Sequence, residues 1–214
     1  AEAEIAAGNR VAVLTRGYGA TKRLDEIVCV KGAEARGMAD VIGDEPALIA
    51  RRVPEVLIAR SADRVAAARM AVAEHGCNVL LLDDGFQHVR LARDENVLLV
   101  DAGNPFGNGR LLPRGILREP VASAARATHI IFTHCDRVAA DDVRELRARF
   151  ERLCTGVPFR TTYHAPDSLC CVQTGAKVPL DALRGAPVAA VCAIARPESF
   201  VATLASLCAN VVEK

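Results

Sequence analysis

Residues 78–88 read NVLLLDDGFQH, an apolar run that ends in two adjacent carboxylates, Asp83 and Asp84. An unbroken apolar run of this kind is typical of a fully buried strand in a parallel sheet. A strand of such a sheet that ends in Asp brings the carboxylate to the edge where ligands bind. In nucleotide-binding sheets, a carboxylate at this position holds Mg²⁺. The alternative is that one aspartate only caps the following turn.

Two features around these carboxylates favour the metal site over a simple cap. Adjacent carboxylates repel each other unless a cation or hydrogen-bond donors lie between them. The residues that follow, Gly85 to His88, add a tight turn and two polar side chains. The stretch therefore predicts a cation site at the edge of a parallel sheet.

Short apolar runs alternate with helical patterns on both sides of this stretch, which indicates an α/β fold with a mainly parallel sheet. Strands are expected at residues 10–15, 27–30, 56–59, 78–82, 96–100, 129–133 and 188–194. Helices are expected from Asp44 to about residue 52, from Ser61 to about 75, from Asp141 to about 153 and from Pro197 to about 209. Asp44 and Ser61 are residues whose side chains can cap a helix.

A segment rich in Gly, Pro and Arg (AGNPFGNGRLLPRGILREP) occupies residues 102–120. Loops of this length are uncommon in compact domains and are usually functional. Arg110, Arg114 and Arg118 lie four residues apart, with Glu119 directly after them. Guanidinium groups spaced in this way could hold an anion bidentately, or they could simply be solvated. We place a division between two α/β units, residues 1–120 and 121–214, near the end of this loop.

Two more motifs contain residues that could carry chemistry, and the first of them directly follows an expected strand. TRGYG (15–19) has glycines that let the backbone approach a ligand, and its Arg16 could contact phosphate, although such a turn can also be purely structural. GDEP (43–46) places Asp44 at a helix start, where it could act as a general base toward a hydroxyl or serve as an ordinary cap. Arg64 lies at the start of another helix, where anions bind, or is a surface charge.

Composition excludes several classes of protein. The chain has 214 residues with 51% hydrophobic residues, which is enough for a real core and excludes general disorder. Its net charge of +1 gives no electrostatic reason to expect nucleic-acid binding. The longest apolar stretch, residues 186–195, is half of the roughly 20 residues that a membrane span needs, so we expect a buried strand there.

Eight cysteines are present, at positions 29, 77, 135, 154, 170, 171, 192 and 208. Their spacing fits neither a zinc knuckle nor a small disulfide scaffold. We interpret most of them as reduced, buried small hydrophobic residues. The alternative is a metal site around His134 and Cys135.

Taken in order, these segments resemble the tetraacyldisaccharide 4′-kinases of lipid A biosynthesis. The resemblance runs from about residue 10 to 204 and is carried by TRGYG (15–19), GDEPALIARR (43–52), SADRVAAA (61–68), LLLDDGFQH (80–88), VLLVDAGNPFGNGRLLPRGILREP (97–120), IIFTHCD (130–136) and AIARPESFVATL (193–204). The combination of DDGFQH with GNGRLLPRGxLREP is specific to this family. The first motif usually begins with Ser in the family, so Thr15 is a mild departure.

The resemblance implies a P-loop NTPase-like three-layer α/β/α domain joined to a second, smaller α/β unit. It implies transfer of the γ-phosphate of ATP to the 4′-hydroxyl of a tetraacylated glucosamine disaccharide 1-phosphate. Mg²⁺ is the implied cofactor beside ATP, and no nucleic-acid partner is implied. The implied location is the cytoplasmic face of a Gram-negative inner membrane.

Site residues follow from the matching motifs. By resemblance, Asp44 is the catalytic base, and Asp83 and Asp84 serve Mg²⁺. The cofactor-binding residues implied are Arg16, Gln87 and His88. The substrate-binding residues implied are Glu45, Arg64, Arg118 and Glu119. A sugar hydroxyl is a poor nucleophile, so a carboxylate that orients and deprotonates it is chemically sensible.

Some family features have no counterpart in these residues. No G-x-x-x-x-G-K-[ST] phosphate loop occurs, and neither the family's N-terminal apolar helix nor its histidine-bearing C-terminal segment is found. We therefore expect the chain to be a fragment of the kinase that does not turn over by itself.

Two rival interpretations remain open. The first is a non-catalytic relative that binds an anionic glycolipid or a nucleotide. The second is a GTPase-like metallochaperone, which would need a guanine-reading N-K-x-D; residues 133–136 read THCD instead.

Overall fold

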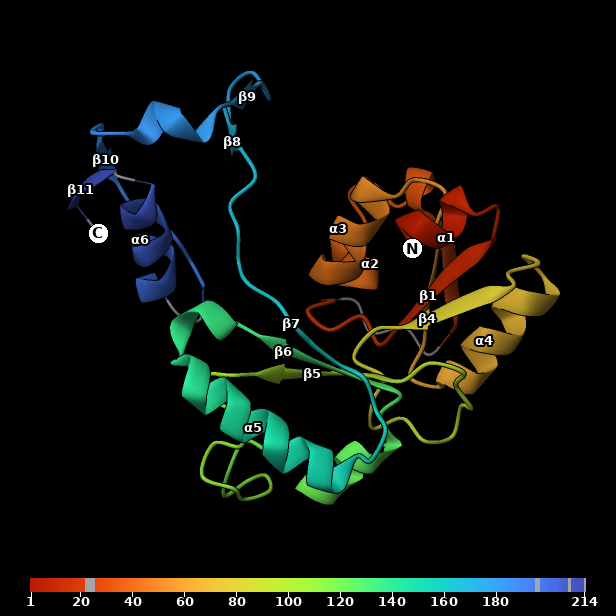
Figure 1. Cartoon of the computed structure of the whole chain (residues 1–214). Coiled ribbons are helices and arrows are strands. Elements are labelled where there is room, and N and C mark those ends of the chain that lie inside the picture. Colours follow the sequence, from red (N-terminus) through yellow and green to blue (C-terminus); the bar gives the residue numbers. More distant parts are fainter. Residues whose placement is uncertain (22–25, 195–196, 208, 214) are drawn as a thin grey trace.

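The computed structural model describes residues 1–21, 26–194, 197–207 and 209–213 (Figure 1). Its helices are α1 (Glu2–Ala6), α2 (Ala39–Ile42), α3 (Asp44–Arg52), α4 (Arg64–Ala73), α5 (Ala140–Leu153) and α6 (Pro197–Ser206). Its strands are β1 (Val11–Thr15), β2 (Val28–Lys31), β3 (Leu57–Arg60), β4 (Val79–Leu82), β5 (Val97–Asp101), β6 (His129–Thr133), β7 (Phe159–Thr161), β8 (Leu169–Cys170), β9 (Lys177–Val178), β10 (Pro187–Ala189) and β11 (Asn210–Glu213).

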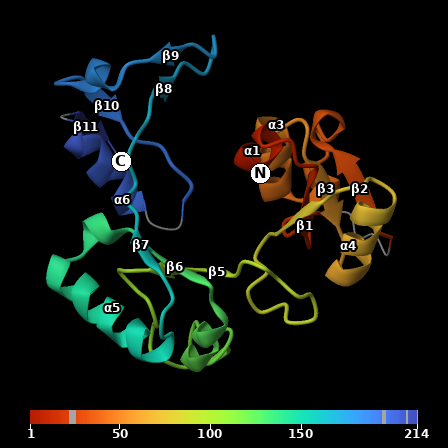
Figure 2. The ribbon, with the colours of Figure 1, turned by 45° about the vertical axis from the view of Figure 1, so that its right-hand side comes forward.

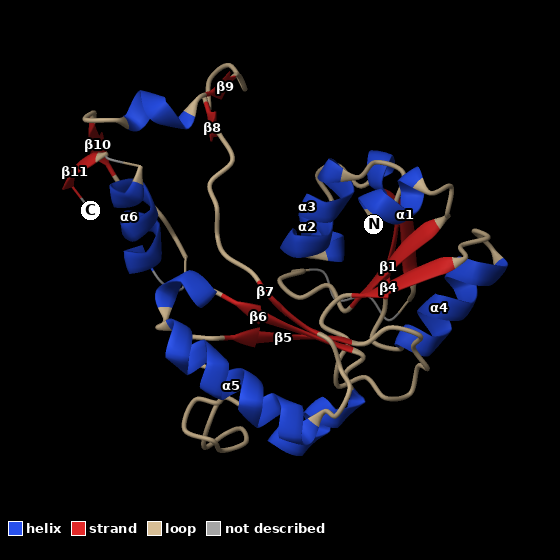
Figure 3. Ribbon diagram, viewed as in Figure 1, coloured by secondary structure: helices blue, strands red, loops and turns tan. Residues whose placement is uncertain are grey.

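The first sheet has the strand order β2-β3-β1-β4, and Figure 3 shows β1 and β4 of this sheet side by side. β1 lies in its middle and pairs in parallel with β3 and β4, whereas β2 is antiparallel to β3. All five residues of β1 are buried. Because successive side chains of a strand point to opposite faces, both faces of this strand must be covered.

Helices cover both faces of the first sheet and produce three layers. Val11 and Val13 pack in one core cluster with Ile42 and Ala50 from α2 and α3. The intervening β1 residues, Ala12 and Leu14, pack in another cluster with alanines of α4. The alternation along β1 thus confirms the expected α/β fold with a mainly parallel sheet.

The second sheet, β5-β6-β7, is entirely parallel. Its core lies under α5, where Phe132 contacts Phe150 edge-on with ring centroids 5.7 Å apart. Val97 and Leu99 of β5 are exposed, the latter by 64%. The remaining strands and α6 lie beyond this sheet, away from the first one (Figure 2).

β4 belongs to the first sheet and β5 to the second. The loop 102–120 therefore follows a strand of the second sheet. The division that the sequence suggests near residue 120 falls downstream of that change. A division of the chain into residues 1–120 and 121–214 stays a prediction.

Several local expectations need correction. β4 is half-buried instead of fully buried, because it pairs only with β1 among the described residues. The strand expected at 188–194 is limited to Pro187–Ala189, and Val191 is 91% exposed. Residue 195, the last of the expected apolar stretch, and residue 208, near the end of the expected last helix, lie outside the described residues.

The start of α4 also differs from the expectation. Its N-cap is Asp63, whose carboxylate accepts hydrogen bonds from the amides of Val65 and Ala66 at 2.9 and 3.2 Å. Ser61 instead accepts a hydrogen bond from the Asp63 amide at 3.1 Å. The serine therefore supports the capping residue.

Cysteine burial is more varied than expected. All seven described cysteines are free thiols, but only Cys77, Cys135 and Cys154 are buried. Cys170 and Cys192 are exposed. Cys208 lies outside the described residues. Within the described ranges, no helix combines the length and the apolar character required to cross a bilayer.

Candidate active site

Strands β1 and β4 lie side by side in parallel. Their carboxyl ends therefore bring the TRGYG and DDGFQH motifs together. The hydroxyl of Thr15 donates a hydrogen bond of 3.0 Å to Oδ2 of Asp83. The same hydroxyl oxygen accepts the amide of Gly17 at 3.1 Å. The backbone amide of Asp83 donates to the carbonyl of Leu14 at 3.0 Å. Asp83 is therefore held in place from its backbone and from its side chain.

The GDEP motif packs directly against the TRGYG loop. Gly43 has a φ of +95°, and a Cβ there would lie 2.4 Å from the carbonyl oxygen of Tyr18. A Cβ on Gly19 would lie 3.2 Å from Oδ2 of Asp44. These contacts require glycine at position 43, because a side chain would separate the two loops. Asp44 and the end of β1 consequently share one side of the sheet edge.

Asp44 is not the N-cap of α3. Gly43 occupies that position, and no side chain caps this helix. Asp44 and Glu45 form its exposed first turn. The interpretation of Asp44 as an ordinary cap is thus wrong, and its carboxylate remains available for another role.

Arg64 is the most unusual cation near this edge. It is only 5% exposed, and its Nε has no hydrogen-bond partner among the described residues. Burial lowers its pKa, as does the positive charge of Arg16, while Asp83 and Asp84 act in the opposite direction. Since buried polar atoms are normally paired, this orphaned donor marks a place for an anion.

His88 is influenced by the same positive charges, those of Arg64 and Arg16. Its Nε2 is buried without a partner among the described residues. Burial lowers its pKa, and the surrounding arginines Arg64, Arg90, Arg16 and Arg93 lower it further. The imidazole can form a hydrogen bond to a ligand that neutralises those charges.

The second carboxylate of the pair, Asp84, faces another partner. It forms an ion pair with Arg118 from the long loop. It also adopts a positive φ of 47°, one of two such non-glycine residues in the described part of the chain. Of the three regularly spaced arginines, only Arg118 is paired with the DDGFQH turn; Arg110 and Arg114 are exposed.

Glu119 braces the turn instead of projecting freely. It accepts a hydrogen bond of 2.6 Å from Arg126, whose guanidinium lies 5.0 Å from the ring centroid of Phe86. Arg93 donates to the carbonyls of Gly85 and Phe86 at 2.6 and 3.2 Å. Two arginines therefore fix the turn that carries the aspartates.

An open groove of about 1040 Å³ runs between β4 and β5. Asp84, Gln87 and Arg118 line it, as do the exposed apolar residues Val97 and Leu99 of β5. Gln87 is exposed to this groove, as a residue that contacts a ligand must be. The groove joins the DDGFQH turn to the second sheet.

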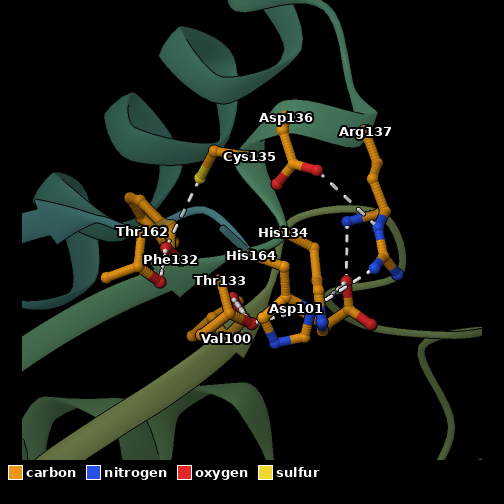
Figure 4. Close-up of polar contacts among 11 residues, drawn as sticks. Val100, Asp101, Phe132, Thr133, His134, Cys135, Asp136, Arg137, Thr162 and His164 are labelled. Carbon is orange, nitrogen blue, oxygen red and sulfur yellow. Dashed lines mark hydrogen bonds and ion pairs between the residues drawn. The ribbon is translucent and has the colours of Figure 1, made fainter. Parts of the chain in front are cut away.

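The alternative metal site around His134 and Cys135 is not formed, because the two side chains diverge (Figure 4). The thiol of Cys135 donates to the carbonyl of Phe132, whereas His134 contacts Asp101 at 3.4 Å and packs edge-on against His164. No cluster of three or more metal-binding side chains occurs within the described ranges.

Sequence reasoning missed the supporting residues Thr15, Arg60, Arg93 and Arg126. Arg60 donates to the carbonyl of Arg16 at 3.4 Å and to that of Val41, which ties the TRGYG loop to the end of α2. A signal existed only for Thr15, whose position after a strand in the TRGYG motif was visible. Nothing in the spacing of the arginines indicates which backbone carbonyls they reach.

Comparison with known proteins identifies the family. The family model for tetraacyldisaccharide-1-P 4′-kinase matches residues 1–214. This chain belongs to the tetraacyldisaccharide-1-P 4′-kinase family. A curated tetraacyldisaccharide 4′-kinase from Anaeromyxobacter dehalogenans is 47% identical over 204 residues, covering 95% of this chain and 53% of the relative. One from Pelobacter propionicus is 38% identical over 208 residues, covering 97% of this chain and 55% of the relative.

The fold agrees with a solved family member. The crystal structure of LpxK from Aquifex aeolicus in complex with ATP superimposes with a TM-score of 0.69 at 28% identity. The match covers 99% of this chain and 62% of the Aquifex chain. The chain thus spans about half the length of the curated relatives that it matches.

Proposed function

We propose that these residues form the acceptor and metal side of a lipid A biosynthesis kinase. The reaction is transfer of the γ-phosphate of ATP to the 4′-hydroxyl of tetraacyldisaccharide 1-phosphate. One observation carries the proposal: the edge of the first sheet gathers the free carboxylate of Asp44, the oriented carboxylate of Asp83 and the unpaired guanidinium of Arg64. A base, a cation ligand and an anion-binding group are the parts that phosphoryl transfer requires.

Asp44 supports the role of general base. It is exposed, it does not cap its helix, and it lies on the same side as the TRGYG loop. In the proposed reaction it accepts the proton of the 4′-hydroxyl while the oxygen attacks the phosphoryl group. Glu45, the next residue of the exposed turn, contacts the acceptor sugar in this proposal.

Asp83 and Asp84 fit a magnesium ion. Thr15 occupies only Oδ2 of Asp83, and no described protein group donates a hydrogen bond to Oδ1. Mg²⁺ commonly uses one or two carboxylates together with phosphate oxygens and water, which matches a site with few protein ligands. When bound, it supplies charge neutralisation at the transferred phosphoryl group. Asp84, which is paired with Arg118 in this structure, would hold the cation together with Asp83.

Arg16 and His88 fit the phosphates of ATP. Arg16 supplies positive charge, and the Nε2 atom of His88 is available as a hydrogen-bonding group. Arg64, which adds positive charge beside the same aspartates, contacts the substrate in this proposal. Gln87 lines the groove next to them. Arg118 and Glu119 help to hold the acceptor side, the latter through the turn that it braces. The proposed setting is the cytoplasmic face of a bacterial inner membrane.

The test is an assay of the full-length protein with ATP and tetraacyldisaccharide 1-phosphate. Asp44→Asn should lower kcat by roughly 10²–10⁴-fold, the usual contribution of a general base. Asp142→Asn is the matched control, because Asp142 is an exposed residue of α5. Equal rates in the wild type and Asp44→Asn would contradict the assignment of the base.

The non-catalytic alternative makes a different prediction in the same assay. A binding relative would retain the glycolipid or the nucleotide without forming a 4′-phosphorylated product. Wild-type protein that binds both ligands but shows no product over the background would favour that alternative.

A further inference from the structure

The proposed base, Asp44, is the first residue of a stripe of side chains along one face of α3. Asp44, Ala47, Leu48 and Arg51 follow the spacing i, i+3, i+4 and i+7, which places them in one stripe of a helix. Together with Ala35, Arg36, Gly37 and Ala39 they line a shallow depression of about 600 Å³. Asp44 is therefore part of the lining of a surface hollow.

The charges in this depression are not balanced. Arg36 and Arg51 line it, and within the described residues neither guanidinium forms an ion pair or a side-chain hydrogen bond. The neighbouring Arg52 differs, because it binds Glu2 of α1 at 2.8 Å. Two unpaired arginines in the lining of one hollow can bind a doubly charged anion such as a phosphate monoester.

The separation of Asp44 and Arg51 along α3 fits the shape of the acceptor. Arg51 lies seven residues after Asp44, which corresponds to roughly 10 Å along a helix. A disaccharide 1-phosphate that is phosphorylated at its 4′ position carries the phosphate and the reacting hydroxyl on different sugars, at opposite ends of the molecule. A subsite for the existing phosphate must therefore lie some distance from the base.

We propose that Arg36 and Arg51 bind the 1-phosphate of the acceptor while its 4′-hydroxyl lies at Asp44. This inference rests on the proposed function and names the acceptor subsite of the same active site. Leu48, which lies between Asp44 and Arg51 on α3 and is 66% exposed, supplies apolar surface to the sugar and its nearest acyl chain. The depression thus recognises the acceptor in two ways. The arginines bind its 1-phosphate, and Asp44 contacts its 4′-hydroxyl.

The experiment compares two acceptors in the full-length kinase: the tetraacyldisaccharide 1-phosphate and the same disaccharide without its 1-phosphate. The variants are Arg51→Ala, Arg36→Ala and the control Arg52→Ala. For the phosphorylated acceptor, we expect Arg51→Ala and Arg36→Ala each to raise KM by about 10- to 100-fold, the loss typical of a hydrogen bond to a charged group. The KM for ATP should not change.

The dephosphorylated acceptor gives the decisive readout. With it, the wild type and the two arginine variants should have the same kcat/KM, because there is no phosphate to bind. A loss of equal size on both acceptors would overturn the inference and assign the arginines a structural role. Arg51→Lys should recover part of the affinity for the phosphorylated acceptor only.

Failure of this inference can be separated from failure of the proposed function. If the wild type phosphorylates neither acceptor, the proposed function is wrong. If the wild type is active and both arginine variants behave like Arg52→Ala, the function stands and the phosphate subsite lies elsewhere.

Discussion

Thr15 shows at the residue scale how a buried hydroxyl can set the direction of a carboxylate. Its hydroxyl oxygen accepts a hydrogen bond from the amide of Gly17, and its hydroxyl proton is donated to Asp83. Thr15→Val keeps the shape but removes both hydrogen bonds. We expect it to lower the free energy of unfolding by about 1–3 kcal/mol, the usual cost of leaving buried polar groups unpaired.

The same substitution should weaken metal binding, because Asp83 would lose its fixed orientation. Binding of Mn²⁺, followed by electron paramagnetic resonance in the full-length protein, measures this without turnover. Thr15→Ser retains the hydroxyl and should restore both stability and metal affinity. Equal Mn²⁺ affinity in Thr15→Val and the wild type would show that the hydroxyl does not orient Asp83.

His88 predicts a pH dependence of stability. Burial and the nearby arginines lower its pKa in the folded protein. Below its ordinary value of about 6.5, the unfolded chain therefore binds more protons at this site than the folded one does. Stability must fall as the pH drops through that value, since the linkage slope follows the difference in bound protons.

Thermal unfolding between pH 7.5 and 5.5 checks this expectation. The wild type should lose more in Tm over this range than His88→Gln, which carries no titrating group at the position. His75→Gln serves as a control for the loss of one histidine elsewhere. Parallel pH profiles for the wild type and His88→Gln would contradict the assignment.

Residue roles differed in how far the sequence could predict them. The position of Asp83 directly after a strand was visible from the apolar run that precedes it, whereas its role as a magnesium ligand stays a prediction. The bracing role of Glu119 was not visible, since it depends on Arg126 folding back seven residues later onto the ring of Phe86. Contacts that arise from loop closure leave no periodic pattern in a sequence.

At the scale of elements, the N-terminus of α4 offers a direct test of capping. The amides of Ala66 and Val65 lower the pKa of the Asp63 carboxylate, with Arg90 and His88 contributing further. A lowered pKa means that this carboxylate stabilises the fold above its ordinary value near 4 and loses that effect as the pH falls. Asp63→Ala should lower Tm at pH 7, whereas Asp63→Asn should retain much of it.

Circular dichroism melts at pH 7 and pH 3 measure both effects. The difference between the wild type and Asp63→Ala should shrink at the lower pH, where the carboxylate is protonated. Asp142→Ala, in the first turn of α5 without a capping contact, is the comparison. A difference in Tm that is independent of pH would argue against capping by the charged form.

The elements themselves were predicted well where they are buried and regular. The expected strand at 129–133 coincides with β6, and the helix from Asp44 to residue 52 coincides with α3. The late strand was too long because an apolar sequence is compatible with an exposed segment. Hydrophobicity alone does not specify what a segment packs against.

At the scale of the whole molecule, alkylation should distinguish the buried cysteine thiols from the exposed ones. Burial raises the pKa of Cys77, Cys135 and Cys154, so these thiols should react only when the protein unfolds. Hydrogen bonds from Thr174 and Gln173 lower the pKa of Cys171. Cys171, together with the exposed Cys170 and Cys192, should be alkylated first by iodoacetamide.

Peptide mass spectrometry after timed labelling at pH 8 distinguishes the groups. Labelling in urea provides the control in which every cysteine reacts. Rapid modification of Cys135 in the native protein would mean that the core under α5 opens more easily than its aromatic packing suggests.

The open groove between β4 and β5 gives a second prediction for the whole molecule. Exposed apolar strands are sites of association. Leu99, which is 64% exposed, should therefore contribute to binding of the dye ANS. Leu99→Lys should reduce ANS fluorescence and light scattering, while Val172→Lys, which changes an exposed valine in a distant segment, should not.

The fold class could be predicted because each strand and helix has its own local pattern. The position at which one sheet gives way to the other could not, because it depends on which strands pair. β5 follows β4 directly in the chain and yet pairs with β6. Strand order is a property of the assembled sheet, and the sequence of either strand does not contain it.

The ion pair between Asp84 and Arg118 gives the site a dependence on ionic strength. The pair joins residues 34 positions apart, and both side chains are more than half exposed. Dissolved salt screens such exposed charges over a Debye length of about 8 Å at physiological concentration. Salt therefore acts on Asp84 twice: it weakens attraction to a divalent cation, and it loosens the arginine that competes for the same oxygens. Because the two effects oppose each other, the cation affinity of this carboxylate should vary less with salt than that of an unpaired aspartate.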